Sequence, residues 1–207
     1  MDRITPYKSS DSKKKQVINM FNNIAESYDL LNLSLSAGMD RIWRKRAIKE
    51  ISTTPKNILD IATGTADFAI SGAKYTNAKI TGIDISEKML EIGKKKIKNK
   101  KLEKRIKLKL ADSEKLPFQE NEFDAITVGF GVRNFENIDK GLEEMHRVLK
   151  PEGTVVILEP SIPKNTPFKQ IYKIYFNYLV PKIGEFISKD KEAYSYLPKS
   201  VAAFPSN

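Results

Sequence analysis

Residues 57–67 constrain the fold of this chain more than any other stretch. They read Asn-Ile-Leu-Asp-Ile-Ala-Thr-Gly-Thr-Ala-Asp: a short apolar run, a turn of small residues, and the start of a helical pattern. A strand, a tight turn and a helix in this order open a nucleotide-binding α/β unit. Small residues let the backbone approach a ligand closely, and the helix N-terminus offers N–H groups without intrahelical partners. We therefore expect the turn at 62–66 to face a ligand.

The middle of the chain alternates between strand and helix patterns. We predict strands at 57–62, 79–84, 106–111, 123–129 and 154–159, with helices at 66–75, 86–100 and 137–150 between them. This alternation is typical of an α/β fold with a parallel sheet and helices on both faces. The carboxyl ends of parallel strands lie on one edge of the sheet, so the loops that follow them should converge on one crevice.

The flanking segments differ from this core. Residues 1–11 are polar and predicted to be loose, a helix should begin after Ser12, and 28–38 reads as a loop or short helices. Residues 39–51 have the pattern of a basic amphipathic helix. The segment 164–187 is apolar around almost its whole helical circumference, which favours burial; a lid or a membrane-contacting surface is the alternative.

The whole chain of 207 residues is predicted to form one domain. We divide it into an N-terminal helical lid at 1–52, an α/β core at 53–160 and a helical segment on the substrate side at 161–207.

Composition excludes several kinds of chemistry. The chain has no cysteine and one histidine, His146, so a thiol nucleophile, a disulfide and a histidine-built metal site are not expected. His146 itself is expected to be a surface or core residue and not a catalytic base. The net charge of +10 points to an anionic partner, or only to a solvated lysine-rich surface. The sequence shows no secretory signal and no apolar run long enough to cross a bilayer, so we expect a cytoplasmic protein.

The glycine pattern and three polar loops indicate the class of ligand. Gly64 is the only glycine in the first turn, so the dinucleotide fingerprint is absent and a ligand without pyrophosphate fits better. Asp84 ends the second strand 20 residues later, where an acid accepts hydrogen bonds from ribose; a plain helix cap is the alternative. Asp112 and Ser113 follow the third strand and could meet an adenine amino group, or form an ordinary polar loop. Gly129 ends the fourth strand.

Together these features make the chain resemble the class I S-adenosylmethionine-dependent methyltransferases. It is most similar to the ubiquinone/menaquinone biosynthesis C-methyltransferase family (UbiE/MenG type), from about Lys15 to Pro205. The motifs that carry the resemblance are Phe21–Asp29, Asn32–Gly38 with Trp43-Arg44, Leu59–Asp67, Gly129–Asn134, Arg147–Pro151 and Tyr194–Val201.

The resemblance implies a three-layer Rossmann-like fold and S-adenosyl-L-methionine as cofactor. The cofactor-binding positions it implies are Asp60, Gly64, Thr65, Asp84, Asp112, Ser113 and Gly129. Gly129 matches a position that can be serine in ubiquinone-type members. Family members continue past the equivalent of Phe204-Pro205 with two strands that form an antiparallel edge, so we expect this edge to be missing here. The Gly-Thr-Ala-Asp form of the first motif favours 2-demethylmenaquinol over a ubiquinol precursor as substrate.

The same resemblance suggests which residues carry the chemistry. A ring carbon becomes nucleophilic when the neighbouring hydroxyl loses its proton, so the protein must favour a phenolate. Arg133 is the first candidate, as a fixed cation or by positioning a water, and Asn134 could orient the same oxygen. Tyr28 could close the site from the lid. The alternatives are that Arg133 only pairs with an acid such as Glu136 or Asp139, and that Tyr28 is part of the core.

The implied partner is a prenylated demethylmenaquinol, whose tail must be collected from a bilayer. We therefore expect peripheral contact with the inner face of the membrane and no nucleic acid partner. The segments that could supply charge and apolar contact for it are 41–49, 94–104 and 168–180. A homodimer or a quinone-synthesis complex is compatible with the resemblance. The competing hypotheses are a methyltransferase acting on another small molecule or on RNA, and a non-catalytic binding partner.

Overall fold

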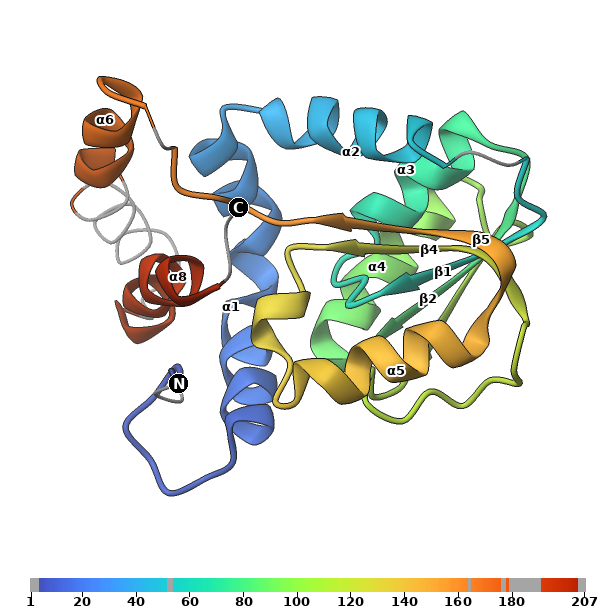
Figure 1. Cartoon of the computed structure of the whole chain (residues 1–207), viewed down its shortest axis with the longest axis horizontal. Helices are drawn as coiled ribbons and strands as arrows, with labels where there is room; N and C mark the ends of the chain where they lie inside the picture. The colour runs from blue at the N-terminus through green and yellow to red at the C-terminus, as the bar shows by residue number, and fades with distance from the viewer. Residues whose placement is uncertain (1–3, 52–53, 164, 176–177, 179–190, 205–207) are drawn as a thin grey trace. The chain divides into compact units, whose positions relative to one another are not determined.

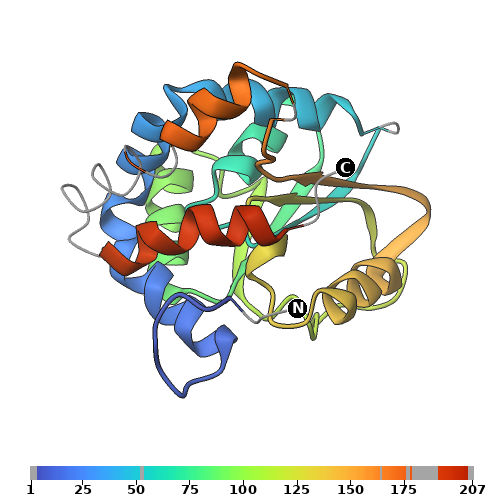
Figure 2. The same cartoon turned by 60° about the vertical axis from the view of Figure 1, so that its left-hand side comes forward.

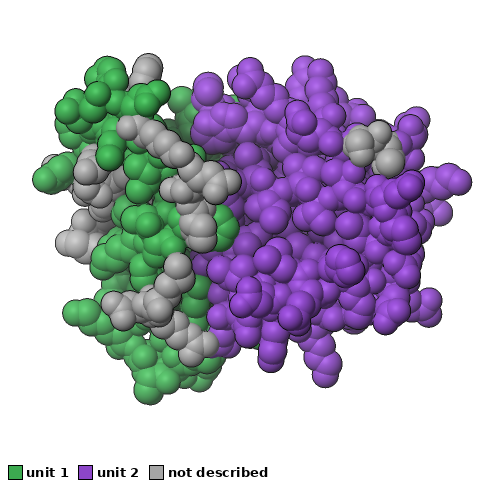
Figure 3. Space-filling view, viewed as in Figure 1, with its two compact units in different colours: residues 1–38, 160–207 green, residues 39–159 purple. Residues whose placement is uncertain are grey.

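The computed structural model describes residues 4–51, 54–163, 165–175, 178 and 191–204. The chain forms two compact units, one of residues 39–159 and one of residues 1–38 with 160–207 (Figure 3). The predicted lid at 1–52 is thus divided, because the helix at 39–49 belongs to the same unit as the sheet. The assignment of a lid and a substrate-side segment stays a prediction.

Unit 39–159 is built on a five-stranded sheet in which every neighbouring pair is parallel. The strands are β1 (Asn57–Ile61), β2 (Lys79–Asp84), β3 (Ile106–Leu110), β4 (Phe123–Gly129) and β5 (Leu149–Leu158), in the spatial order β3-β2-β1-β4-β5. The predicted α/β class and parallel sheet are confirmed. Within the described residues no antiparallel strand extends this sheet beyond β5.

Helices cover both faces of the sheet. They are α2 (Met39–Lys49), α3 (Asp67–Tyr75), α4 (Glu87–Asn99) and α5 (Ile138–Val148), with a short 3-10 helix, η1, at Val132–Asn134. Figure 1 shows α2 and α3 on one side of the sheet and α5 on the other. Of these helices, α2 contacts α3 and β5, α3 and α4 contact β2 and β3, and α5 contacts β5.

One apolar cluster holds these layers together. It joins side chains of β1, β2 and β4 to those of α2, α3 and α4; its most deeply buried members include Ile58, Ala69, Ala78, Ile80 and Ala125. Burying such side chains supplies most of the driving force for packing helices on a sheet. The Ser86 hydroxyl accepts a hydrogen bond from the Met89 amide at 3.3 Å and so caps the N-terminus of α4.

The boundary between α5 and β5 differs from the prediction. The helix ends at Val148 and the strand begins at Leu149, five residues earlier than expected. Phe123 pairs with Leu149 and Ala125 pairs with Thr154, so the residues between Leu149 and Thr154 form an irregular bulge in β5. Lys150–Gly153 do not end the strand, because a bulge lets the chain pair on both sides of them.

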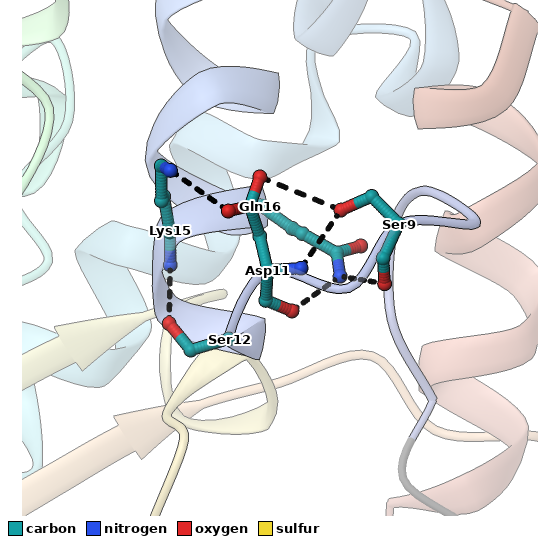
Figure 4. Close-up of polar contacts among 5 residues, drawn as sticks. All are labelled: Ser9, Asp11, Ser12, Lys15 and Gln16. Atoms are coloured by element: carbon teal, nitrogen blue, oxygen red, sulfur yellow. Dashed lines mark hydrogen bonds and ion pairs between the residues drawn. The ribbon is translucent and has the colours of Figure 1, made fainter.

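The second unit begins with α1 (Lys13–Ser36). Residues 9–16 are joined by hydrogen bonds and are not loose: Gln16 donates to the carbonyls of Ser9 and Asp11, and the Ser12 hydroxyl caps the helix (Figure 4). The helix also continues through 28–36, where a loop or short helices were expected. It ends at Ala37 and Gly38, both with positive φ, and both amides donate to the Leu33 carbonyl.

The same unit contains α6 (Phe168–Ile174) and α8 (Lys191–Ala203). Figure 2 shows α8 as one continuous helix although it contains Pro198. Ile174 and Tyr178 are exposed, so the expected burial around the whole circumference does not hold for these two residues. The Tyr175 hydroxyl donates to the Leu35 carbonyl at 2.6 Å. The rest of the predicted helix at 176–187, apart from Tyr178, lies outside the described residues.

Among the residues that the structure describes, no helix has the length and apolarity needed to cross a bilayer.

A buried carboxylate joins the two central strands. Asp60 of β1 is paired in register with Thr127 of β4, whose hydroxyl donates to the carboxylate at 2.7 Å, and the Thr63 hydroxyl donates to the other oxygen at 2.5 Å. The side chain is completely buried. Burial raises the pKa of Asp60 to about 6, although the Thr63 and Thr127 hydrogen bonds and the charge of Arg44 oppose the rise.

This raised pKa predicts a pH-dependent stability. The Asp60 contribution is fully present below the unfolded pKa near 3.8 and is lost as the pH rises through about 6. The difference of about two pKa units corresponds to ~3 kcal/mol. Between pH 4 and pH 7.5 the unfolding free energy of Asp60→Asn should therefore improve relative to wild type by up to ~3 kcal/mol. Urea unfolding at several pH values measures this change.

Asp124→Asn is the matched control, because its carboxyl titrates in the opposite direction. Burial raises the pKa of Asp124, but the Lys150 ammonium and the amides of Asn57 and Lys56 outweigh it and lower the pKa. Asp124→Asn should therefore cost more stability at pH 7.5 than at pH 4. The same pH trend in both variants would contradict the role of burial at Asp60.

Candidate active site

The loops after β1, β2 and β4 meet where the strand order reverses. β1 lies between β2 and β4, so the chain crosses from β1 to β2 on one side and returns to β4 on the other. In parallel α/β sheets, ligands bind at the carboxyl ends of the strands beside such a switch point. The convergence expected from the sequence is confirmed for these three loops.

The turn after β1 has a strained backbone. Ala62, Gly64 and Ala66 all have positive φ, at 53°, 54° and 68°, and two of them are not glycine. Such conformations persist only where surrounding contacts enforce them, and they cluster at ligand sites. Here the Thr63 amide donates to the Ile83 carbonyl at 2.9 Å. The turn is therefore fixed against the end of β2.

The Asp60 carboxylate is hydrogen-bonded to this turn through Thr63. Its two oxygens take the hydroxyls of Thr63 and Thr127, and none of its surface is exposed. Gly82 of β2 makes room for the arrangement, since a Cβ there would lie 2.8 Å from the Thr63 hydroxyl oxygen. In the structure the Asp60 carboxylate contacts this turn through Thr63, and its role in cofactor binding stays a prediction.

Asp84 connects the first turn to the second. One carboxylate oxygen accepts the Gly64 amide at 2.8 Å and the other accepts the Ser86 amide at 2.8 Å. Burial raises the pKa of Asp84, with these backbone hydrogen bonds opposing the rise. The side chain that caps α4 is Ser86 and not Asp84. Each oxygen of a carboxylate can accept two hydrogen bonds. The Asp84 carboxylate can therefore accept two ribose hydroxyls in addition to the amides of Gly64 and Ser86.

Thr65 turns its hydroxyl toward α4. Its oxygen receives a hydrogen bond from the Lys96 ammonium at 3.1 Å, and the same ammonium pairs with Asp67 at 2.5 Å. Thr65 is buried. Lys96 therefore links α4 to the first turn of α3, a contact that sequence reasoning did not identify. The sequence could not single out Lys96, because α4 contains several lysines with no feature that distinguishes this one.

Asp112 and Ser113 follow β3 in a half-buried loop. The loop starts beside Asp84, because the Ala111 amide donates to the Asp84 carbonyl at 3.0 Å. The Asp112 carboxylate accepts the Glu114 amide at 2.9 Å. This places a carboxylate and further backbone groups on the same sheet edge as Asp84, as predicted.

Two glycines allow the end of β4 to approach its neighbours. A Cβ on Gly129 would lie 2.8 Å from the Phe68 ring, and one on Gly131 would lie 2.5 Å from the Ala62 Cβ. Contacts this short are not tolerated, so even alanine requires a shift at either position. A serine at Gly129, the alternative implied by the resemblance, would require Phe68 to move.

Arg133 and Asn134 both hold the loop that follows β4. Phe130 has a φ of 61°, and its carbonyl accepts hydrogen bonds from Arg133 Nη1 at 2.6 Å and from Asn134 Nδ2 at 3.2 Å. Arg133 Nη1 also pairs with Glu159 at 2.6 Å. Arg133 therefore pairs with an acid, and this acid is Glu159, which was not among the acids named from the sequence. A catalytic role for Arg133 stays a prediction.

A second buried arginine approaches the same loop. Arg44 of α2 forms a buried ion pair with Asp40, and its guanidinium lies 5.8 Å from the centre of the Phe130 ring. A cation over an aromatic face stabilises the ring in place. The basic pattern of α2 concealed this residue, which is the one arginine in that helix with a buried side chain.

Two further residues named from the sequence are Tyr28 and His146. Tyr28 is on α1, in the other compact unit, where its ring meets Phe21 edge-on with the centroids 6.1 Å apart. His146 is exposed on α5. The described residues contain no group of three or more side chains that could hold a metal ion.

The hydrogen-bond acceptors at this edge fit a nucleoside with a free ribose. Asp84 and Asp112 present carboxylate acceptors, which suit hydroxyl and amino donors and repel phosphate. The first turn contains one glycine, Gly64, and so lacks the repeated glycines that let a backbone approach a pyrophosphate closely. The residues present therefore fit S-adenosylmethionine, which carries a ribose diol, an adenine amino group and no phosphate.

Comparison with solved structures agrees with this fold. A Methanococcus maripaludis structure assigned to the S-adenosylmethionine-dependent methyltransferases matches 95% of this chain and 87% of its own, at 21% identity and a TM-score of 0.62. The [4+2]-cyclase SpnF matches 73% of this chain and 62% of its own, at 22% identity and a TM-score of 0.63. At such identities the likeness concerns the fold alone.

Comparison of sequences is more specific. Demethylmenaquinone methyltransferase of Bacteroides fragilis is 47% identical over 99% of this chain and 84% of its own length. The enzyme of the same name from Porphyromonas gingivalis is 46% identical over 99% of this chain and 84% of its own length. A third relative is the ubiquinone/menaquinone biosynthesis C-methyltransferase UbiE of Geotalea daltonii. It is 47% identical over 94% of this chain and 83% of its own length. The model of the ubiE/COQ5 methyltransferase family matches residues 9–207. The chain therefore belongs to the ubiE/COQ5 methyltransferase family.

Proposed function

We propose that this protein transfers a methyl group from S-adenosylmethionine to a ring carbon of a prenylated quinol, with 2-demethylmenaquinol as substrate. The observation that carries the proposal is the 46–47% identity to demethylmenaquinone methyltransferases over 84% of their length. The geometry supports it, because the loops after β1, β2 and β4 meet at a switch point whose carboxylates suit a nucleoside without phosphate.

The cofactor would be held mainly by the ends of β1, β2 and β3. Asp84 would accept hydrogen bonds from the ribose, Asp112 and Ser113 would meet the adenine, and the turn around Gly64 would provide close backbone contact. Bound there, S-adenosylmethionine supplies a methyl group on a positively charged sulfur that leaves as a neutral thioether. Asp60 and Thr65 would not contact the cofactor through their side chains but would hold the turn that does.

The chain's own residues must make the quinol carbon nucleophilic. Deprotonation of the adjacent hydroxyl places negative charge on the ortho carbon, and a fixed cation nearby favours that phenolate. Arg133 is our candidate for this cation, with Asn134 orienting the same oxygen. Both are anchored to the Phe130 carbonyl, so their positions are set before substrate binds. Tyr28 is our candidate for closing the site over the substrate.

Asp84→Asn should weaken S-adenosylmethionine binding by about 10-fold or more, because a hydrogen bond to a charged group is worth ~1.5–3 kcal/mol. Isothermal titration calorimetry measures the affinity. Asp124→Asn provides the matched control, since it makes the same chemical change at the start of β4, where Asp124 holds Lys150 and the Asn57 amide. Equal affinity of Asp84→Asn and wild type would contradict the ribose role.

Transfer of a labelled methyl group tests the function itself. Demethylmenaquinol with a short isoprenoid tail should be methylated, and tRNA and soluble phenols should not. Arg133→Ala should lower the rate by about 100-fold or more, as expected when a group that stabilises developing charge is removed. Binding of S-adenosylmethionine without transfer to the quinol would instead support a non-catalytic role.

We also propose that α2 is the part of the protein that meets the membrane surface. Its exposed face carries Met39, Ile42 and Trp43, and its cations Arg41, Lys45, Arg46 and Lys49 are exposed as well. Apolar and aromatic residues flanked by cations are typical of helices that lie in a bilayer interface. A prenylated substrate requires such contact, because its tail resides in the bilayer.

Trp43 is the only tryptophan in the sequence, so its fluorescence reports on this surface alone. Vesicles with anionic lipid should shift its emission to shorter wavelength, and high salt should reverse the shift. Lys45→Gln with Arg46→Gln should weaken vesicle binding by about 25-fold, at ~1 kcal/mol for each lost charge. Lys95→Gln with Lys98→Gln on α4 removes the same charge elsewhere and should have a smaller effect. Equal effects would indicate binding through net charge only.

A further inference from the structure

Glu159 is a buried acid that none of the sequence motifs singled out. It follows β5 directly, and its carboxylate lies 2.6 Å from Arg133 Nη1. The side chains of Glu159 and Arg133 are only 7% and 9% exposed. A buried ion pair of this kind is costly to desolvate and is not in itself a source of stability, so its presence beyond the carboxyl ends of β4 and β5 invites a functional explanation.

The carboxylate holds Arg133 at two points. One oxygen accepts the side-chain Nη1, and the other accepts the Arg133 backbone amide at 3.4 Å. Nη1 donates a second hydrogen bond, to the Phe130 carbonyl at 2.6 Å. The two acceptors, Phe130 and Glu159, follow different strands, and together they fix the plane of the guanidinium, because rotation of the side chain would break both contacts.

We propose that Glu159 is a positioning residue for methyl transfer and acts through Arg133. The inference rests on the proposed function, in which Arg133 stabilises the phenolate of the bound quinol. A cation that is already oriented stabilises developing charge without reorganising during the reaction. Glu159 provides this orientation by tying the loop after β4 to the end of β5, where the Phe130 amide also donates to the Leu158 carbonyl at 2.7 Å.

The pair also sets the charge that the quinol experiences. Glu159 offsets part of the positive charge of Arg133, while the other charges around Phe130, Arg44 and Asp40, are paired with each other. Loss of the carboxylate leaves Arg133 uncompensated and favours the phenolate. Loss of the guanidinium leaves Glu159 uncompensated and disfavours it. The two changes should therefore move the ionisation of the bound quinol in opposite directions.

The test measures single-turnover methyl transfer from pH 6 to pH 9 with saturating S-adenosylmethionine and short-tailed demethylmenaquinol. Glu159→Gln should lower the plateau rate by about 10- to 100-fold, as expected for a misplaced catalytic group, and shift the acid limb to lower pH by about one unit. Arg133→Ala should lower the plateau and shift the acid limb to higher pH. Affinity for S-adenosylmethionine should stay within about two-fold of wild type in both, since neither residue is assigned to the cofactor.

Glu144→Gln is the matched control, because Glu144 forms an ion pair with Arg147 at 2.6 Å on α5. It should leave both the plateau and the acid limb unchanged. Glu159→Asp keeps the charge but shortens the side chain, so the acid limb should stay at the wild-type pH while the plateau falls.

Three results would overturn the inference. A plateau and acid limb of Glu159→Gln equal to those of wild type would do so while leaving the proposed function intact, provided Arg133→Ala is impaired. Failure of both Glu159 variants to fold would make the ion pair a structural one. A wild-type protein that binds S-adenosylmethionine but methylates no quinol would overturn the proposed function, and the inference with it.

Discussion

The candidate site depends on a carboxylate that never meets solvent. Asp60 binds the hydroxyls of Thr63 and Thr127, and so joins the two central strands to the turn that leaves β1. Burying a carboxylate is unfavourable unless hydrogen bonds satisfy it, which explains why its pKa is raised and why both oxygens are occupied. A strained turn with positive φ at two alanines can persist because this support lies directly beneath it.

A second set of contacts fixes the loop that follows β4. Phe130 also has a positive φ, and Arg133, Asn134 and Arg44 each contact it, through its carbonyl or its ring. The turn after β1 and the loop after β4 thus follow the same principle. In each, several hydrogen bonds hold a strained backbone conformation in place. In our proposal Glu159 extends this principle to the chemistry, because the residue that orients the arginine also adjusts its charge.

Much of this arrangement was predictable from residue spacing. The apolar runs and the turn residues between them predicted all five strands, and the position of Asp84 at a strand end predicted that it lies at the same sheet edge as the first turn. The errors have physical causes. The bulge in β5 lets a strand continue across the turn residues Lys150–Gly153, which resemble a strand boundary in the sequence. Residues 28–36 continue α1 although their polar and apolar residues show no clear period.

The sequence by itself determined the class of fold, the family and the edge of the sheet at which a ligand is expected, because these follow from local periodicity and from motifs contiguous in the chain. Only the tertiary structure decided which charged groups meet. Arg133 and Glu159 are 26 residues apart, and Lys96 reaches Thr65 across 31. Nearby acids such as Glu136 looked equally suitable as partners. Side-chain pairing depends on which strand ends lie together, and that becomes fixed only when the whole sheet has assembled.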